Sequence, residues 1–574
     1  MDNMKSKIYK NISLLIFAFG LTQGVLFSMN EAVEPDSNNI IWRDDFESGS
    51  MDGWEIINEV DDDTPGWFVE KGYLIQDTDC GNTKTLLGTN IVNGKAEWDN
   101  YTMRTNLVCT DDDYIGVLFR FTDVDNYYRF LLSSQRDLIC IEKKVNGHFT
   151  RLAVTDEKWQ YVKFSVTIAL NDNNIKVYLN DELYFDVNDD EFKNGKIGFT
   201  SISNLGSFFD DVTVYSNYNV IQPETNLEIC RGPYLQNVLE DHAVIMWDTS
   251  LPASSEVEYG LSKDETRTQA DTAQTTKHEI KLEQLERDTT YYYRAISGTQ
   301  KSEWYSFRTA IEGDKPFKFL AYGDTQMNFL RHKELVEQFS KHDYDFMINC
   351  GDVVQYGPRS DWDTEFFAPL KDILTGKPVY AAIGNHELNS ENYYKNFANP
   401  DDTHENYYSF EYGNSFFIFI DNPLTAYPDK EYYTDYKPGS EQYKWLEEQL
   451  SSSEAQNAEW LFVMSHVPAY IGDTFDLFPG CRDYLVPLFE KYGVDISFSG
   501  HVHGYDRGEA KGVTYVITAG GGGAQNKNGW EEKNEYKGFK LVYNFCILEI
   551  DGSRLSFKAY DKENNLIDEF EITH

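Results

Sequence analysis

Residues able to bind metal ions follow five separate apolar runs in the second half of this 574-residue chain. Most of them come shortly after a glycine, which leaves a strand sharply and lets the backbone approach a bound group closely. They combine oxygen and imidazole donors without a thiolate, a set that suits zinc, iron or manganese better than calcium. The pattern therefore predicts a transition-metal site. The candidate ligands are Asp324, Asp352, Asn385, His466, His501 and His503.

The apolar runs themselves predict strands that alternate with helices. They span residues 317–322, 345–349, 379–383, 460–464, 494–498 and 513–519, and helix-like patterns lie between several of them. Such alternation predicts an α/β domain. In open α/β folds the carboxyl ends of the strands converge on one crevice, so ligands distant in sequence can meet there.

The spacing of the last two histidines indicates two ions rather than one. On a regular strand, His501 and His503 would point to opposite faces, whereas from a turn they can address two different ions. A carboxylate such as that of Asp352 can bridge metals about 3.5 to 4 Å apart, the spacing at which two cations clamp an in-line displacement at phosphorus. We therefore expect a dinuclear centre.

Taken in order, these motifs resemble those of calcineurin-like metallophosphoesterases, specifically the purple acid phosphatase branch. The resemblance implies an αββα-type sandwich over residues 315–574, with two divalent or mixed-valence transition-metal ions (Fe, Zn or Mn). It implies that Asp324, Asp352 and His503 hold the first ion, and that Asp352, Asn385, His466 and His501 hold the second. The motifs are Asp324, Gly351-Asp352, Gly384-Asn385-His386-Glu387, Val463-Met464-Ser465-His466 and Gly500-His501-Val502-His503, supported by 407–410 and 505–507.

The chain departs from that branch at two positions near the first ion. The branch has a tyrosinate ligand three residues after the bridging aspartate, but Gln355 stands there and Tyr356 follows it. Position 326 is Gln, where the branch usually has Gly and the wider family His. Gln326 and Tyr356 are therefore candidates to contact the first metal or one of its ligands. The purple colour of the branch is not expected to carry over.

The resemblance implies a phosphatase that hydrolyses phosphate monoesters. A hydroxide held between the two metals that Asp352 bridges would attack phosphorus in line, because a metal-bound water has a lowered pKa. His386 is the candidate general acid for the leaving alkoxide, since the pKa of an imidazole lies in the required range. The alternative role for His386 is a hydrogen bond that orients a ligand or contacts Glu387.

Two β-rich segments precede the metal-binding residues. Residues 38–217 carry short runs bounded by turn residues, including 114–121, 159–166, 175–184 and 196–200, which predict an all-β sandwich. The opening 43–46 and closing 209–214 segments loosely resemble concanavalin-like jelly-roll modules, which implies a candidate polysaccharide-binding role. Trp54 and Trp67 would serve that role if exposed, although tryptophans of a sandwich more often lie in its core.

Residues 228–310 form the second β-rich segment, with expected strands at 243–247, 256–259, 278–282, 291–296 and 304–308. Their spacing suits a fibronectin type III-like sandwich. The segments 231–236, 244–247 and 290–294 resemble the N-terminal domain of purple acid phosphatases. Because this segment has no catalytic cluster of its own, we expect it to act as a scaffold.

Charge and targeting patterns limit partners and location. The chain has 95 Asp plus Glu against 51 Lys plus Arg, a formal net charge of −44, which disfavours a nucleic-acid-binding surface. Three lysines before the apolar run 12–27 predict a signal peptide over residues 1–28, with an uncleaved anchor as the alternative. No other stretch is apolar enough to span a membrane. The expected location is secreted or periplasmic.

Two other functions stay open at this point. One keeps the metals but cleaves phosphodiesters or nucleotides. The other, of a different class, is a glycan-binding or adhesive protein with an inert phosphatase domain. The seven cysteines show no CxxC or Cys/His spacing typical of zinc, so a metal-thiolate site is not expected and their disulfide pairing stays open.

Overall fold

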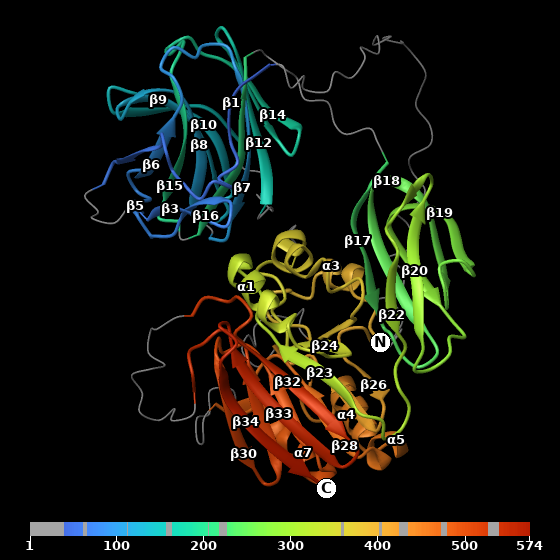
Figure 1. The fold of residues 1–574 in the computed structure, drawn as a ribbon. Helices are drawn as coiled ribbons and strands as arrows, with labels where there is room; N and C mark the ends of the chain where they lie inside the picture. The colour runs from blue at the N-terminus through green and yellow to red at the C-terminus, as the bar shows by residue number, and fades with distance from the viewer. Residues whose placement is uncertain are drawn as a thin grey trace, which may run out of the picture.

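The computed structural model describes residues 39–60, 66–111, 113–155, 163–204, 206–216, 227–357, 361–400, 404–423, 434–471, 479–525 and 539–574. The predicted signal peptide, 1–28, lies outside these ranges. Figure 1 shows two β-rich bodies and a larger body of sheets and helices that ends at the C-terminus. Among the helices in these ranges, none is long and apolar enough to cross a membrane.

The first body is a sandwich of two eight-stranded sheets around one apolar core. One sheet has the order β14 (Glu182–Asn188), β13 (Asn174–Leu179), β12 (Lys163–Asn171), β7 (Thr102–Cys109), β16 (Ser207–Tyr215), β4 (Tyr73–Gln76) and β3 (Trp67–Glu70), with β1 (Ile40–Asp44) on β16. The other has the order β11 (His148–Thr155), β10 (Leu138–Val145), β9 (Asn126–Ser133), β8 (Tyr114–Asp123), β15 (Lys196–Ile202), β6 (Leu87–Asn93) and β2 (Glu55–Asn58), with β5 (Gly81–Asn82) on β6.

Two details of this sandwich differ from the sequence expectation. The run 175–184 is not one strand but a hairpin, because Asn180 and Asp181 adopt positive φ angles of 48° and 66° and turn the chain between β13 and β14. The tryptophans considered for sugar binding are packed inward. Trp67 is buried and donates to Thr89, and the half-buried Trp54 stacks on Phe199. Neither ring forms an exposed platform.

The second body is a six-stranded sheet built around the long strand β18 (Ala243–Gly260). The two short strands predicted at 243–247 and 256–259 are the two halves of β18. The first half pairs with β17 (Ile229–Gln236), and the second pairs with β20 (Thr290–Ser297). Side chains of both halves share one core. The remaining strands are β19 (Arg267–Leu282) on β18, and β21 (Gln300–Lys301) and β22 (Tyr305–Arg308) on β20.

The third body holds two six-stranded sheets that face each other. The first has the order β25 (Val379–Ala381), β24 (Phe346–Asn349), β23 (Phe317–Tyr322), β32 (Asn544–Asp551), β33 (Arg554–Asp561) and β34 (Leu566–Thr573). The second has the order β26 (Tyr408–Tyr412), β27 (Ser415–Phe419), β28 (Trp460–Met464), β29 (Ile496–Ser499), β31 (Val513–Thr518) and β30 (Tyr505–Ala510). All six strands expected from the apolar runs are present, with ends within two residues of those expected.

Alternation along the strands explains the four layers of this body. In β23, Phe317 and Phe319 join the core between the sheets, whereas Leu320 and Tyr322 face the helices. Because both faces of each central strand are buried, these strands appear in the sequence as continuous apolar runs. The outer layer on the first sheet contains α1 (Phe329–Phe339), the π-helix η2 (Trp362–Phe367), α2 (Ala368–Leu370) and α3 (Glu391–Asn396). The outer layer on the second contains α4 (Glu441–Leu450), α5 (Ser453–Asn457), α6 (Pro479–Tyr484) and α7 (Val486–Tyr492).

The first body packs against α1, next to the loop that carries Asp324. Phe329 and Leu330 of α1 are buried in an apolar cluster with Ile75 and Phe208 of the sandwich. Burying such side chains away from water stabilises this contact. A salt bridge of 3.1 Å between Lys71 and Glu334 lies in the same interface.

His332 of α1 generates a prediction about stability. Its ring is fully buried, with Nδ1 donating to the Glu365 carbonyl at 2.7 Å and Nε2 near the Tyr322 hydroxyl. Burial lowers the pKa of His332 to about 4. In the unfolded chain the His332 imidazole has a pKa of about 6.5 and binds a proton as the pH falls below that value. In the folded chain it stays neutral until the pH approaches about 4. The contribution of His332 to the free energy of unfolding is therefore fully present above about pH 6.5 and is lost as the pH falls toward about 4.

Lowering the pH from 7 to 5 should reduce the unfolding free energy of the wild-type protein by about 2 kcal/mol through His332. His332→Gln should lose that part of the pH dependence, as measured by urea denaturation at both pH values. The exposed His148 provides the matched control, because His148→Gln should retain the wild-type slope. An unchanged slope in His332→Gln would contradict the assignment.

Candidate metal centre

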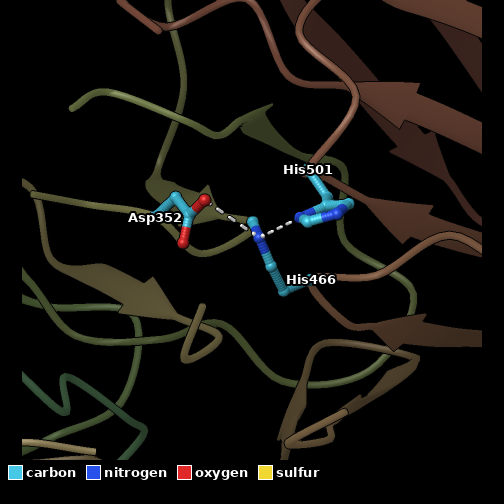
Figure 2. A group of neighbouring side chains, drawn as sticks. All are labelled: Asp352, His466 and His501. Carbon is cyan, nitrogen blue, oxygen red and sulfur yellow. Dashed lines mark hydrogen bonds and ion pairs between the residues drawn. The ribbon is translucent and has the colours of Figure 1, made fainter. Parts of the chain in front are cut away.

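Strand ends from both sheets of the third body bring the predicted ligands together. Asp324, Asp352 and Asn385 follow β23, β24 and β25 of the first sheet, whereas His466 and His501 follow β28 and β29 of the second. The candidate ligands therefore gather between the strand ends of two facing sheets rather than along the edge of one. Figure 2 shows Asp352, His466 and His501 pointing toward one another, and one donor atom from each lies within 4.8 Å of the others.

One donor set is centred on His466, whose ring is fully buried. Its Nδ1 donates to the Cys350 carbonyl at 3.0 Å, which leaves Nε2 to face the site. Nε2 lies 3.1 Å from Asp352 Oδ2, 3.0 Å from Asn385 Oδ1 and 3.1 Å from His501 Nδ1. These are the four residues predicted to hold the second ion.

The other donor set is centred on His503. Its Nδ1 donates to the Ala524 carbonyl at 2.7 Å, so Nε2 again faces inward. Nε2 lies 3.5 Å from Asp324 Oδ1 and 3.3 Å from the side-chain amide nitrogen of Gln326. That nitrogen is also 3.3 Å from Asp352 Oδ2, the oxygen that belongs to the first set. The Gln326 amide nitrogen therefore connects Asp352 Oδ2 of the first set to His503 of the second.

These separations fit cation coordination. With metal–ligand bonds of about 2.1 Å, neighbouring donors lie about 3.0 Å apart in an octahedron and about 3.4 Å apart in a tetrahedron. The observed distances of 3.0–3.5 Å span the same range. Carboxylate, amide and imidazole donors suit zinc, iron or manganese. The residues present fit a pair of such ions.

The ligand loops adopt strained backbone conformations. Asp324, Asp352 and His501 have φ angles of 57°, 51° and 70°, which side chains with a Cβ rarely adopt. Close approach also requires glycine, since a Cβ on Gly384 would lie 2.2 Å from Asp352 Oδ1. A Cβ on Gly523 would lie 2.6 Å from the His503 ring, so the glycine run 520–523 borders the site by packing beneath its loops.

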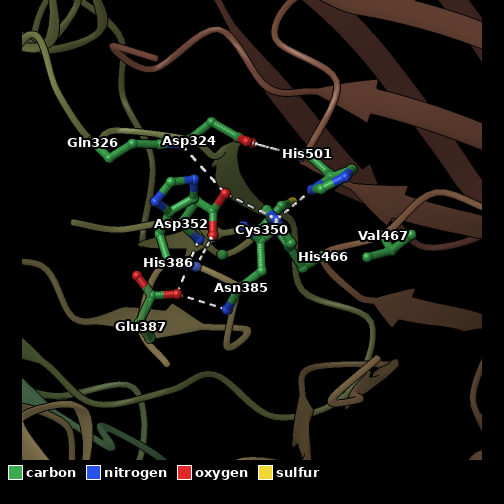
Figure 3. A network of polar contacts seen from close by, with 12 residues as sticks. Asp324, Gln326, Cys350, Asp352, Asn385, His386, Glu387, His466, Val467 and His501 are labelled. Carbon is green, nitrogen blue, oxygen red and sulfur yellow. Dashed lines mark hydrogen bonds and ion pairs between the residues drawn. The ribbon is translucent and has the colours of Figure 1, made fainter. Parts of the chain in front are cut away.

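Two buried glutamates, Glu387 and Glu365, hold these loops in place, and Figure 3 shows Glu387 beside Asp352. Glu387 accepts hydrogen bonds from four backbone N–H groups, those of residues 352, 353, 354 and 384, at 2.6–3.2 Å. Glu365 of η2 accepts from the N–H groups of Met327 at 2.9 Å and Gln355 at 2.6 Å, and so joins the loops after β23 and β24. The sequence motif contains Glu387, but nothing in the sequence singled out Glu365.

Electrostatics within the cluster place a proton on His466. Burial acts to raise the pKa of Asp352, but the His466 and His386 imidazoles outweigh it and hold that pKa well below its ordinary value. Burial acts to lower the pKa of His466, but the Asp352 carboxylate raises it to about 9. Burial and the adjacent His466 lower the pKa of His501 to about 3. Because a metal-bound imidazole has lost this proton, cation binding should release it and should weaken at low pH.

His386 lies at the edge of the site. Its backbone N–H donates to Asp352 Oδ1 at 2.9 Å, and its Nδ1 donates to the Gln355 carbonyl at 2.9 Å. Nε2 is therefore the ring atom left for proton transfer. The backbone N–H of Tyr356 donates to Asp361 at 2.8 Å.

Comparison with known proteins agrees with this geometry. Residues 317–505 match the calcineurin-like phosphoesterase family, and residues 233–309 match the purple acid phosphatase N-terminal domain. The chain therefore contains a calcineurin-like phosphoesterase domain preceded by a purple acid phosphatase N-terminal domain. The first sandwich, residues 40–215, lies outside both matches.

Similar proteins include several purple acid phosphatases. "Probable purple acid phosphatase 20" of Arabidopsis thaliana is 27% identical over 300 residues, which is 46% of this chain and 66% of that protein. "Fe(3+)-Zn(2+) purple acid phosphatase 12" of the same plant is 26% identical, over 56% of this chain and 74% of that protein. A yellow lupin purple acid phosphatase structure has a TM-score of 0.54 at 17% identity, covering 89% of this chain and 95% of that one, which supports the fold of the phosphoesterase domain.

The role of Glu387 can be tested through stability. Burial and the Asp352 carboxylate act to raise the pKa of Glu387, whereas four backbone N–H donors to its two oxygens favour the ionised form, which accepts all four bonds. Glu387→Gln would turn an NH₂ group toward two of those donors. We expect a loss of about 1 to 3 kcal/mol in the free energy of unfolding, measured by urea denaturation at pH 7. The exposed Glu391→Gln is the control and should change little. Equal stability of the two variants would contradict this role.

Proposed function

We propose that this chain is an exported phosphatase that hydrolyses phosphate monoesters with two transition-metal ions. The observation that supports it best is the pair of donor sets, one around His466 and one around His503, which Asp352 and Gln326 connect. The first ion would be held by Asp324, Asp352 and His503. The second would be held by Asp352, Asn385, His466 and His501. A similar protein named for Fe(3+) and Zn(2+) supports iron and zinc as the ions to test first.

Lewis acidity is what such a pair of ions supplies, because it neutralises charge on a phosphate ester and acidifies water near neutral pH. The chain's own contribution is position and charge. Asp352 would be the ligand common to both ions. Glu387 and Glu365 hold the ligand loops in place by accepting hydrogen bonds from their backbones. Two cations would also reverse the local sign of a chain whose net charge of −44 otherwise slows the approach of phosphate esters.

His386 is the proposed general acid. Its backbone bond to Asp352 and its Nδ1 bond to Gln355 fix the ring, so that Nε2 would carry the second proton. Donating that proton to the leaving oxygen would lower the barrier for alkoxides, which are poor leaving groups.

The upstream bodies would position this domain rather than act on the substrate. We propose a jelly-roll module at residues 38–217 and a fibronectin type III-like domain at 228–310. Polysaccharide binding by the first module is not favoured by its buried Trp67 or its stacked Trp54. Export rests on the leader pattern in residues 1–28.

Metal dependence provides the direct test. After treatment with a strong chelator, hydrolysis of p-nitrophenyl phosphate should be lost and should return on adding Fe, Zn or Mn. His466→Ala should reduce kcat/KM by at least about 100-fold, because altering even a ligand's partner costs 10- to 100-fold. His148→Ala, on an exposed hairpin, should leave the activity unchanged. Faster hydrolysis of bis(p-nitrophenyl) phosphate would favour a phosphodiesterase instead, and no activity with either compound would defeat the proposal.

The acid role of His386 has its own signature. His386→Gln should slow hydrolysis of an alkyl phosphate, such as glycerol phosphate, by about 10² to 10⁴-fold. It should affect p-nitrophenyl phosphate far less, because p-nitrophenolate leaves without being protonated. Steady-state kinetics on both substrates measures the difference. An equal loss on both would assign His386 a positioning role.

A further inference from the structure

Gln326 is a buried amide placed between two predicted ligands. It follows Asp324 by two residues, and its side chain is fully excluded from solvent. Its amide nitrogen lies 3.3 Å from Asp352 Oδ2 and 3.3 Å from His503 Nε2, and Figure 3 shows it beside Asp324 and Asp352. Within the described part of the chain, its amide oxygen Oε1 accepts no hydrogen bond.

An unsatisfied buried amide oxygen is costly and calls for a partner. The nitrogen and oxygen of an amide exchange places by a half turn of its terminal torsion. After that turn, Oε1 would face Asp352 Oδ2 and His503 Nε2. All three atoms would then present lone pairs to one point, an arrangement that a bound cation stabilises.

The resulting set completes a coordination shell. Asp324, Asp352 and His503 supply three donors to the first ion, and an amide oxygen from Gln326 would be the fourth. Four protein donors satisfy a tetrahedral ion and leave room for further ligands on a larger one. The 3.3 Å separations match the donor spacing of such shells.

The backbone on both sides of Gln326 is held so that its side chain points inward. Its own N–H donates to the Asp352 carbonyl at 3.3 Å, and the Thr325 hydroxyl donates to Val353 at 2.7 Å. On the other side, Met327 has a φ of 72° and donates its N–H to Glu365. This makes the amide a preorganised donor rather than a chance neighbour.

Gln355 is the competing candidate. It is also buried and its Oε1 also lacks a hydrogen bond among the described residues. Its recorded bonds, however, are made by its backbone, to Glu365 and His386. No described contact joins its amide to a predicted ligand.

We propose that Gln326 Oε1 is a protein ligand of the ion held by Asp324, Asp352 and His503. This inference rests on the proposed dinuclear function and assigns the fourth donor of its first site. The alternative is that Gln326 only donates a hydrogen bond to Asp352 through its amide nitrogen.

Three variants of the full chain separate these roles, with metal content measured by plasma mass spectrometry after loading with Zn²⁺ or Mn²⁺ and dialysis. The wild type should retain two ions. Gln326→Leu should retain one, with affinity for the other weakened at least about tenfold. Gln326→Glu should retain two, because a carboxylate still offers oxygen, whereas a hydrogen-bond donor role predicts that it loses one. Gln355→Leu is the matched control and should retain two.

Each result decides whether Gln326 is a metal ligand or only a hydrogen-bond donor. Two tightly bound ions in Gln326→Leu, or loss of an ion from Gln326→Glu, would overturn the assignment while leaving the dinuclear function standing. If Gln355→Leu rather than Gln326→Leu lost an ion, Gln355 would be the ligand, and the assignment of Gln326 would be overturned. A wild-type chain that binds no ion would defeat both the inference and the proposed function. Circular dichroism should confirm that each variant keeps the wild-type fold.

Discussion

One buried carboxylate at the meeting point of the ligand loops is the constraint on which the rest of this structure depends. Asp352 is almost fully buried, and its Oδ2 lies near His466 and Gln326. The carboxylate, amide and imidazole ligand atoms gathered around it attract one another only through a shared proton or cation. The fold must therefore hold them together by forces applied elsewhere, which the hydrogen bonds of Glu387 and Glu365 to the loop backbones supply.

The two facing sheets make that arrangement possible. Each central strand is buried on both faces, so it is stiff and ends at a defined place. Loops leaving β23 and β24 meet loops leaving β28 and β29 across the gap between the sheets. The N–H of His501 donates to Asp324 from 177 residues away, which links the two halves directly at the site. Side chains from one sheet alone would supply only part of either donor set.

Features that depend on a short segment of the chain could be predicted from the sequence. These are the six strands of the apolar runs, the types of metal ligand that follow them and the glycine at position 384 beside a ligand. Features that depend on turns or on packing between distant segments could not be predicted. A turn at Asn180 and Asp181 divides one expected run, and two expected strands are halves of β18. Glu365 follows Asp361 and Asp363 in an acidic segment that has no pattern of a site, and only the packing of η2 beside two loops gives Glu365 its role.

By themselves, the residues and their order determined the chemistry available, because donor type and strand period are properties of short segments. They predicted six candidate ligands and two ions, whereas the resemblance to metallophosphoesterases implied which ligands hold which ion and left Gln326 and Tyr356 open as contacts of the first ion. Only the tertiary structure supported one of these contacts, since it puts the Gln326 amide nitrogen 3.3 Å from both Asp352 and His503. The reason is physical: distances between loops depend on sheet pairing, buried hydrogen bonds and positive φ angles, which join residues that no local pattern connects.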